Sequence, residues 1–342
     1  MYSMNISIDK LKELVNQIFL KAGCPTEVAK ACTHSLILAE ICGVKTHGLN
    51  MVSKHVQKIL KREYNLAPTL IKNLSTTTFA RFDANNTIGM YSATKCMDYA
   101  IQQAKESGIY SVFAHHCNTL SAAFVYALQA IQEEMIGIVM SNAPAQMPPV
   151  GGRSKLLGTN PIAFAIPAKK NHPIIVDMAT STVAKSKIIE ARDKGLEIPL
   201  NWALDSDGNP TNNAQKALEG LVLPMAGAKG YSLAIIIDIL TGVLSGANYL
   251  NNVNRFYNPS TPCMNVGHTF IAINPKLIIG EEFYTKIDDY INIIHSSDSI
   301  NNQTRVKLPG ERKLEKKLIA EKNGYEINEE LYNELMHFLR YE

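Results

Sequence analysis

The segment between residues 76 and 180 constrains the fold most, because short apolar runs alternate there with longer stretches of helical periodicity. Runs with the length and β-branched content of strands occur at residues 76–82, 109–114, 136–140, 162–166 and 173–176. Residues 89–107 and 120–134 instead repeat apolar residues at helical spacing. This alternation predicts an α/β fold in which helices cover a sheet.

Helical patterns flank this segment. Residues 7–22, 25–43 and 52–60 repeat apolar side chains every three or four positions, and the last thirty residues predict two helices separated at Asn323 and Gly324. We therefore expect three parts: a helical part at 1–75, an α/β domain at 76–305, and C-terminal helices at 306–342 that pack back on the first part.

Composition limits the possible partners. The chain has 342 residues, 46% hydrophobic and 19% charged, and a formal net charge of +3 that is too small to favour nucleic acid. The basic run 305–317 also carries Glu311 and Glu315, which favours a solvated helical face over a phosphate-binding patch. The apolar run 233–244 is too short for a bilayer and contains Asp238, so it predicts a buried helix and no membrane partner.

Six cysteines are present without a C-x-x-C pair or a zinc-like spacing, which predicts reduced thiols and no metal site. The first residues lack a basic segment followed by an apolar one, the pattern of a secretion signal. The expected location is therefore the cytoplasm.

Polar residues follow the predicted strand 173–176 and begin a candidate site. Thr180 or Ser181 can cap a helix running toward Gly195, and the free N–H groups of a helix start attract anions such as cofactor phosphates. Lys229, beside small residues at the start of another helix, suits an anion too. An ordinary strand, turn and helix remains the alternative.

No common catalytic or cofactor motif is present: the sequence contains no G-x-G-x-x-G after a strand, G-x-x-x-x-G-K-[ST], H-E-x-x-H or G-x-S-x-G. His47 lies between Thr46 and Gly48, where little side-chain bulk lets a ligand approach the imidazole. His47 is thus a candidate catalytic residue, with an incidental histidine as the alternative.

Eight short pieces of the chain, in order, resemble the malate/L-lactate dehydrogenase-like oxidoreductases, a family that includes ureidoglycolate, sulfolactate and diketogulonate dehydrogenases and a cyclic-imine reductase. They are T-H-G at 46–48, I-G-I at 136–138, G-G-R at 151–153, L-G-T-N-P at 157–161, D-M-A-T-S at 177–181, W-A-L-D at 202–205, K-G-Y at 229–231 and L-P-G at 308–310. The resemblance implies an NAD(P)-dependent enzyme whose cofactor domain, here 76–305, has a mixed sheet and is not a Rossmann fold. It also implies a homodimer with sites near the subunit interface.

The same resemblance implies roles for single residues. His47 would be the acid/base, Thr46 its hydrogen-bond partner, and Asp177 a group that orients the histidine or balances its charge. The implied cofactor contacts are Asp177, Met178, Ala179, Thr180, Ser181, Thr182, Val183, Ala228, Lys229, Pro309, Gly310 and Glu311. The implied substrate-pocket residues are Met51, Thr119, Arg153, Gly158, Thr159 and Asn160.

Two positions depart from the family pattern. Met51 replaces an arginine that could clamp a substrate carboxylate, and Thr119 replaces a histidine that a threonine cannot match as an acid/base. His115 and His116, just upstream, are candidates to compensate.

Three hypotheses remain. The first is a reductase or dehydrogenase for a small 2-oxo acid, 2-hydroxy acid or cyclic imine, with Arg153 or Lys54 holding the carboxylate. The second is a diverged biosynthetic reductase whose bulkier or non-carboxylate substrate packs against Met51. The third is a non-catalytic relative that keeps the fold as a binding partner. No residue spacing separates NAD from NADP as the cofactor.

Overall fold

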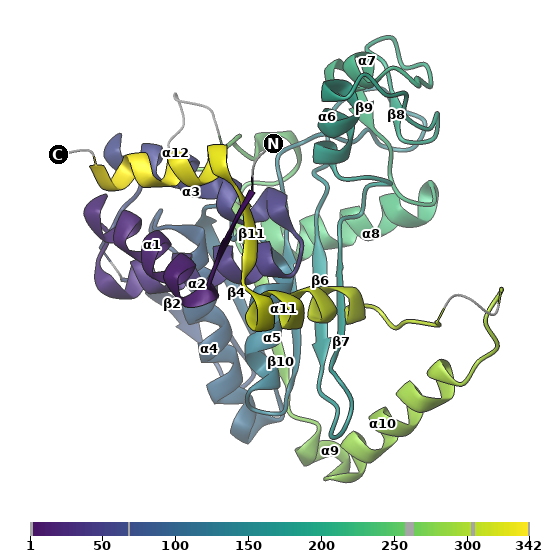
Figure 1. The fold of residues 1–342 in the computed structure, drawn as a ribbon. Helices are drawn as coiled ribbons and strands as arrows, with labels where there is room; N and C mark the ends of the chain where they lie inside the picture. The colour runs from purple at the N-terminus through teal and green to yellow at the C-terminus, as the bar shows by residue number, and fades with distance from the viewer. Residues whose placement is uncertain (1–2, 68, 257–262, 302–304, 341–342) are drawn as a thin grey trace.

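The computed structural model describes residues 3–67, 69–256, 263–301 and 305–340. Figure 1 shows a central sheet flanked by helices. The strands are β1 (Ser3–Ile6), β2 (Ile71–Ser75), β3 (Phe79–Asp83), β4 (Ile109–Cys117), β5 (Ile136–Ser141), β6 (Ile162–Ile166), β7 (Ile174–Met178), β8 (Ala203–Leu204), β9 (Leu221–Val222), β10 (Val266–Ile273) and β11 (Tyr325–Asn328).

The α-helices are α1 (Ile8–Lys21), α2 (Thr26–Ile41), α3 (Val52–Leu60), α4 (Gly89–Ser107), α5 (Ala123–Ile131), α6 (Lys185–Asp193), α7 (Ala214–Glu219), α8 (Ala228–Asp238), α9 (Lys276–Ile279), α10 (Glu282–His295), α11 (Glu311–Asn323) and α12 (Glu329–Arg340). Shorter turns of helix are η1 (Lys45–His47), η2 (Leu49–Met51), the π-helical η3 (Ile239–Val243) and η4 (Leu250–Asn252).

The main sheet has seven strands in the order β2-β3-β4-β10-β5-β6-β7. Only the pair β3 and β4 is parallel; the other neighbours are antiparallel. A parallel doubly wound sheet with a glycine fingerprint is therefore not what this chain builds. The predicted α/β class with a mixed sheet is confirmed.

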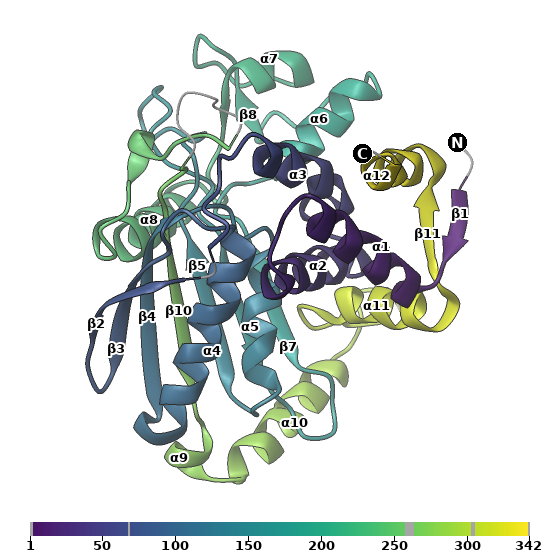
Figure 2. The same ribbon diagram turned by 90° about the vertical axis from the view of Figure 1, so that its left-hand side faces the viewer.

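The two faces of this sheet are covered differently. Helices α4 and α5 pack along one face, as Figure 2 shows, and bury a large apolar core that includes Tyr110, Tyr126 and Phe270. On the opposite face α8 and η3 cover β5, β6 and β10 around a small cluster of Met140, Ile162 and Ile237. The two faces therefore carry apolar cores of very different size.

Both ends of the chain contribute to a second core. Strand β1 pairs antiparallel with β11, and α12 packs on α1 and α3. Leu11, Phe19 and Leu36 are fully buried in this core. The small β1-β11 ribbon was not predicted: the two C-terminal helices are separated by a strand, because Tyr325–Asn328 finds a pairing partner more than 300 residues earlier in the chain.

The predicted strand at 76–82 is wrong at its start. The Thr76 hydroxyl accepts a hydrogen bond from the backbone N–H of Phe79 at 3.1 Å, which makes residues 76–79 a turn between β2 and β3. Strand β2 was missed because all five of its residues are exposed, so the sequence there has no apolar alternation.

The prediction of a buried helix at 233–244 is also wrong. Helix α8 ends at Asp238 and continues as η3, and along this length Ile236, Ile239, Val243 and Leu244 are about half exposed, at 52%, 45%, 53% and 54%. Only the opposite side of the helix packs on the sheet. The run is apolar on all sides of the helix. One side packs on the sheet, and the other forms an apolar stripe on the surface.

Residues 185–222, with α6, β8, α7 and β9, form a small lobe beside the end of the sheet (Figure 1). Its own core contains Ile188, Ile198 and Val222. Within the described part of the chain, no helix has both the length and the apolar character needed to cross a membrane.

Candidate active site

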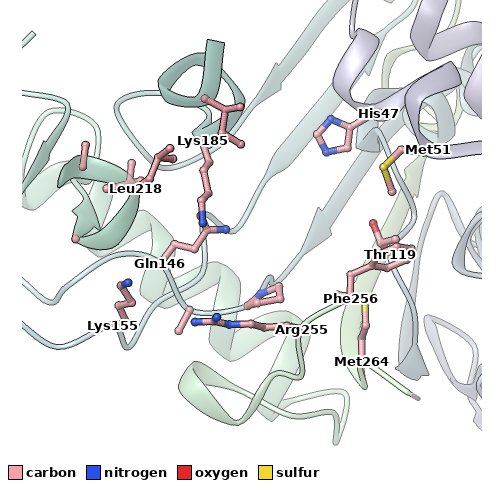
Figure 3. A pocket seen from close by; sticks show the side chains of 16 residues that line it. His47, Met51, Thr119, Gln146, Lys155, Lys185, Leu218, Arg255, Phe256 and Met264 are labelled. Carbon is pink, nitrogen blue, oxygen red and sulfur yellow. The ribbon is translucent and has the colours of Figure 1, made fainter. Parts of the chain in front are cut away.

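A cavity of about 970 Å³ opens between this lobe, the N-terminal helices and the ends of the sheet strands. Its lining joins segments far apart in sequence, as Figure 3 shows: His47 and Met51 before α3, Thr119 after β4, and Lys185 in the lobe. The described residues that line it are His47, Met51, Thr119, Pro144, Ala145, Gln146, Lys155, Lys185, Ile189, Ala217, Leu218, Gly220, Val222, Arg255, Phe256 and Met264.

Two hydroxyl groups hold His47 in place, one from the preceding residue and one from the segment after β4. The Thr46 hydroxyl lies 3.0 Å from His47 Nδ1, and the Ser121 hydroxyl donates to the His47 carbonyl at 2.5 Å. Because a hydroxyl can donate or accept, Thr46 can pair with Nδ1 whether or not that nitrogen carries a proton. The other ring nitrogen, Nε2, is left for a ligand.

Glu40, on α2, supports the same loop from below. It is buried, and Oε2 accepts the backbone N–H of Leu49 at 2.8 Å while Oε1 accepts the Tyr325 hydroxyl. Gly48 packs directly on it: a Cβ at Gly48 would lie 2.9 Å from the Glu40 Cα, closer than side chains tolerate. Glycine is needed after His47, because a side chain at this position would clash with Glu40 on α2.

The environment of His47 favours its neutral form. The ring reaches solvent at the cavity, yet desolvation by the surrounding protein lowers its pKa below the ordinary value. The Asp177 carboxylate raises the pKa, and the charges of Lys313 and Lys54 lower it again. A neutral imidazole near pH 7 can accept a proton.

Asp177 makes its hydrogen-bonded ion pair with Lys313. Lys313 Nζ lies 3.0 Å from Asp177 Oδ2, and both side chains are mostly buried. The same ammonium lies 4.7 Å from the centre of the Phe124 ring. Lys313 was predicted to belong to a solvated helical face, and that expectation is wrong for this residue, which faces inward from α11.

The predicted helix cap at Thr180 or Ser181 is wrong. Helix α6 starts only at Lys185, and the two hydroxyls donate to the carbonyls of Thr159 and Val183. The segment pairs instead with residues 223–225: Thr182 N–H donates to Leu223 O at 2.8 Å and Met225 N–H to Thr180 O at 2.9 Å. The stretch behaves as an extra edge of strand because its backbone finds partners there.

This pairing brings two predicted cofactor segments together. The strand-like stretch 180–182 lies beside residues 223–225, which lead into α8 through Gly227, and Ala228 and Lys229 are exposed in its first turn. Gly227 has a positive φ of 61°, and no atom lies within 4 Å of where its Cβ would be. Met178 is exposed and Ala179 and Val183 are partly so, which leaves surface for a ligand along this edge.

The third predicted cofactor segment lies beside β7. Pro309 O accepts the backbone N–H of Ile175 at 3.1 Å, and Gly310 has a positive φ and touches Ile175 so closely that a Cβ would lie 2.6 Å from that side chain. The Glu311 carboxylate already pairs with His295. Residues 309–311 therefore lie beside β7, the strand that contains Asp177. Helix α11, which begins at Glu311, supplies the Lys313 that pairs with Asp177.

The predicted substrate residues divide into two groups. Met51 and Thr119 line the cavity, whereas Arg153, Gly158, Thr159 and Asn160 lie outside its lining. Arg153 is exposed, and Asn160 is fully buried with its amide bonded to Ala143 N–H and Ala234 O. His115 and His116 also lie outside the lining and do not replace the missing histidine at Thr119.

Several cavity residues had no clear signal in the sequence. Lys155, Lys185 and Arg255 bring three cations to one side of the cavity, and none of its described lining residues is acidic. Burial lowers the pKa of Lys185, and the nearby charges of Lys155 and Arg255 lower it further. These residues come from two loops and from the start of α6, so only the folded chain reveals that they meet.

This chain is similar to known dehydrogenases along nearly its whole length. The model of the family described as malate/L-lactate dehydrogenase matches residues 6–336. The L-sulfolactate dehydrogenase of Methanocaldococcus jannaschii is 35% identical over 325 residues, which cover 95% of this chain and 93% of that protein. A solved structure of a sulfolactate dehydrogenase from Methanocaldococcus jannaschii has a TM-score of 0.91 and 34% identity, and the match covers 98% of this chain and 96% of that one.

Two further relatives are named for other dehydrogenase activities. The malate dehydrogenase of Pyrococcus horikoshii is 36% identical over 313 residues, 89% of this chain and 86% of that protein. The (2R)-3-sulfolactate dehydrogenase (NADP(+)) of Chromohalobacter salexigens is 29% identical over 312 residues, 91% of each chain. The chain thus belongs to the malate/L-lactate dehydrogenase family and is an NAD(P)-dependent dehydrogenase or reductase.

Proposed function

We propose that this protein transfers a hydride between NAD or NADP and a small 2-oxo acid, 2-hydroxy acid or cyclic imine that carries an anionic group, with His47 as the acid/base. The observation that carries the proposal is one cavity that joins His47 to the cations Lys155, Lys185 and Arg255. Relatives named for malate and sulfolactate, which are both anions, support the substrate class.

Three segments of the chain would hold the cofactor. They are residues 177–183, the first turn of α8 with Ala228 and Lys229, and residues 309–311. The free N–H groups at the start of α8, the charge of Lys229 and the open space beside Gly227 suit a phosphate. When bound, the nicotinamide supplies or accepts the hydride, that is, two electrons and one hydrogen nucleus.

His47 would handle the proton that balances this transfer. In the reducing direction the carbonyl carbon gains the hydride and the oxygen takes a proton from His47 Nε2; for an imine, the nitrogen takes it. In the oxidising direction neutral His47 removes the hydroxyl proton. Thr46 keeps the ring oriented in both states, since its hydroxyl can donate to Nδ1 or accept from it.

The three cations would hold the anionic group. Met51 occupies the position where the family pattern has an arginine. Another residue of the cavity therefore has to hold the anionic group of the substrate. Lys185, Lys155 and Arg255 are the cations in the described lining, and Lys155 Nζ is already oriented by the Glu219 carbonyl at 3.0 Å. An anion bound there would also relieve the mutual repulsion that lowers the pKa of Lys185.

A bulkier substrate is the second candidate, and a specific observation favours it. Met51, Phe256 and Met264 gather beside His47 and Thr119 in the cavity (Figure 3), where a carboxylate clamp would otherwise sit. The variant Met51→Arg separates the two. If small 2-oxo acids are excluded only because the clamp is missing, their kcat/KM rises; if Lys185 and Arg255 already hold them, it does not.

The direct test is a two-step assay. NADH and NADPH are first titrated into the protein by fluorescence, and cofactor oxidation is then followed with 2-oxo monoacids, 2-oxo diacids, a sulfonated 2-oxo acid and cyclic imines. We expect one of the two cofactors to bind and 2-oxo acids with a second anionic group to turn over best. Cofactor binding without turnover of any compound would contradict the proposal and favour a non-catalytic relative.

We also propose that the homodimer forms through the exposed stripe of α8 and η3, residues Ile236, Ile239, Val243 and Leu244. An apolar stripe of this length on a soluble protein is typical of a protein interface. Light scattering after gel filtration should give a dimer for the native chain and a monomer for Val243→Lys. A monomeric native chain, or a Val243→Lys variant that stays dimeric, would contradict this choice of surface.

A further inference from the structure

A second cluster of chemically active side chains lies away from the cavity, at the ends of β3 and β4. Asp83 is the last residue of β3 and lies opposite His115 in the parallel pair. One ligand atom from each of Asp83, His115 and His116 lies within 4.8 Å of the other two. None of the three lines the 970 Å³ cavity.

The two histidines share one side of the sheet, which neighbours in a strand normally do not. Their ring centres are only 4.5 Å apart. His116 achieves this with a positive φ of 50°, a conformation uncommon for a residue with a side chain, and Asn265 Oδ1 accepts its backbone N–H at 2.9 Å. The backbone thus turns both imidazoles toward Asp83.

One nitrogen of His115 has no partner among the described residues. The side chain is only 6% exposed, and this nitrogen, Nδ1, is buried. Nε2 lies 3.0 Å from Asn73 Oδ1. An amide oxygen only accepts hydrogen bonds, so Nε2 carries the proton and Nδ1 presents its lone pair. An imidazole that donates one N–H to an oxygen and turns its free lone pair to other ligands is the usual arrangement at a metal site.

The other two groups are prepared in a similar way. Asp83 Oδ1 accepts the backbone N–H of Asn85 at 2.7 Å, which fixes the carboxylate. Asp83 Oδ2 lies 3.0 Å from His116 Nδ1. Two imidazole nitrogens and one carboxylate form a ligand set that suits zinc.

We propose that Asp83, His115 and His116 bind one Zn²⁺ ion. The three side chains supply three of the four tetrahedral positions, and the fourth is left to water. The ion takes the place of the direct contact between His116 and Asp83 and satisfies the buried Nδ1 of His115. This site could not be predicted from the sequence, because its ligands include no cysteine pair and lie on two strands far apart in the chain.

The test uses untagged protein, stripped with a chelator and dialysed, then titrated with Zn²⁺ by calorimetry and with Co²⁺ by visible absorption. The main variant is His116→Asn, because asparagine tolerates the positive φ at this position. His172→Asn, an exposed histidine elsewhere, is the matched control. Since loss of a mere supporting partner weakens metal binding about 10- to 100-fold, loss of a ligand should weaken it at least as much.

We expect one equivalent of Zn²⁺ in the native chain and in His172→Asn, the absorption of tetrahedral Co²⁺ in both, and neither in His116→Asn at the same concentrations. Asp83→Asn gives an independent second variant, with circular dichroism to check that it folds, and the same loss is expected. A native chain that binds no zinc, or a His116→Asn variant that binds it as tightly as the native chain, would overturn the proposal.

Discussion

The two walls of the cavity differ in chemistry and in how they are built. On one wall are His47, Met51 and Thr119, neutral or apolar groups supplied by the N-terminal helices and the end of β4. On the other are Lys155, Lys185 and Arg255, supplied by loops and by the small lobe. The first wall offers a proton carrier, and the second offers charge.

The two walls therefore suit binding and chemistry separately within one cavity. His47 is fixed by Thr46, Ser121 and the Glu40 loop contact, so its position depends on rigid helices. The cations have long side chains and come from the small lobe (Lys185) and from two loops (Lys155 and Arg255), which suits the recognition of a charge more than the placement of a reacting atom. Variants on the first wall should therefore change kcat, and variants on the second should change KM.

The largest effect is expected for His47→Ala. Loss of the acid/base should lower kcat by about 100- to 10,000-fold, since positioned proton transfer contributes that much. Cofactor affinity, measured by NAD(P)H fluorescence, should stay nearly unchanged. His172→Ala, on the exposed surface, serves as the control. A His47→Ala enzyme that turns over like the native one would remove His47 from the mechanism.

Lys185→Met should have the next largest effect, and it should appear mainly in KM. A hydrogen bond to a charged group is worth about 1.5–3 kcal/mol, so kcat/KM for an anionic substrate should fall roughly 10- to 100-fold. Lys187→Met, on the same helix but outside the cavity lining and paired with Glu190, is the matched control. Weaker NAD(P)H binding with an unchanged substrate KM would instead assign the cations to a cofactor phosphate.

Tyr325→Phe should give a smaller effect that tests how the first wall is supported. Its hydroxyl donates to the buried Glu40, which also holds the Leu49 N–H next to the His47 loop. We expect kcat to fall by roughly 3- to 10-fold, with substrate KM and cofactor affinity little changed, because a lost buried hydrogen bond costs about 1–3 kcal/mol and only part of this reaches His47. Glu40→Gln should act in the same direction. A change confined to KM would contradict a positioning role.

Much of the sheet was predictable from the sequence, because its inner strands are apolar runs whose pattern depends on local burial. Residues 89–107 and 162–166 were predicted with the boundaries of α4 and β6. Exposed β2 and the β1-β11 ribbon were not, since pairing across long sequence distances leaves no local pattern. The apolar run 233–244 misled because the sequence does not say which side of a helix is covered.

The candidate site was predictable only in part. His47, Met51 and Thr119 were singled out in the sequence, and the folded chain brings them to one cavity. Lys185 and Arg255 were not, because a lysine or arginine is usually a surface residue and its neighbours are known only after folding. Lys313 was expected on a solvated face, but its contact with Asp177 depends on how α11 packs against β7.

The pH dependence of kcat/KM in both directions tests the role of His47 most directly. Because its pKa is lowered below the ordinary value of about 6.5, its protonated form is lost as pH rises through a value on the acid side of neutrality. Reduction should therefore slow, and oxidation should quicken, through the same acidic pKa. The same pH dependence in His47→Ala, or profiles in which neither direction changes across that range, would contradict the account.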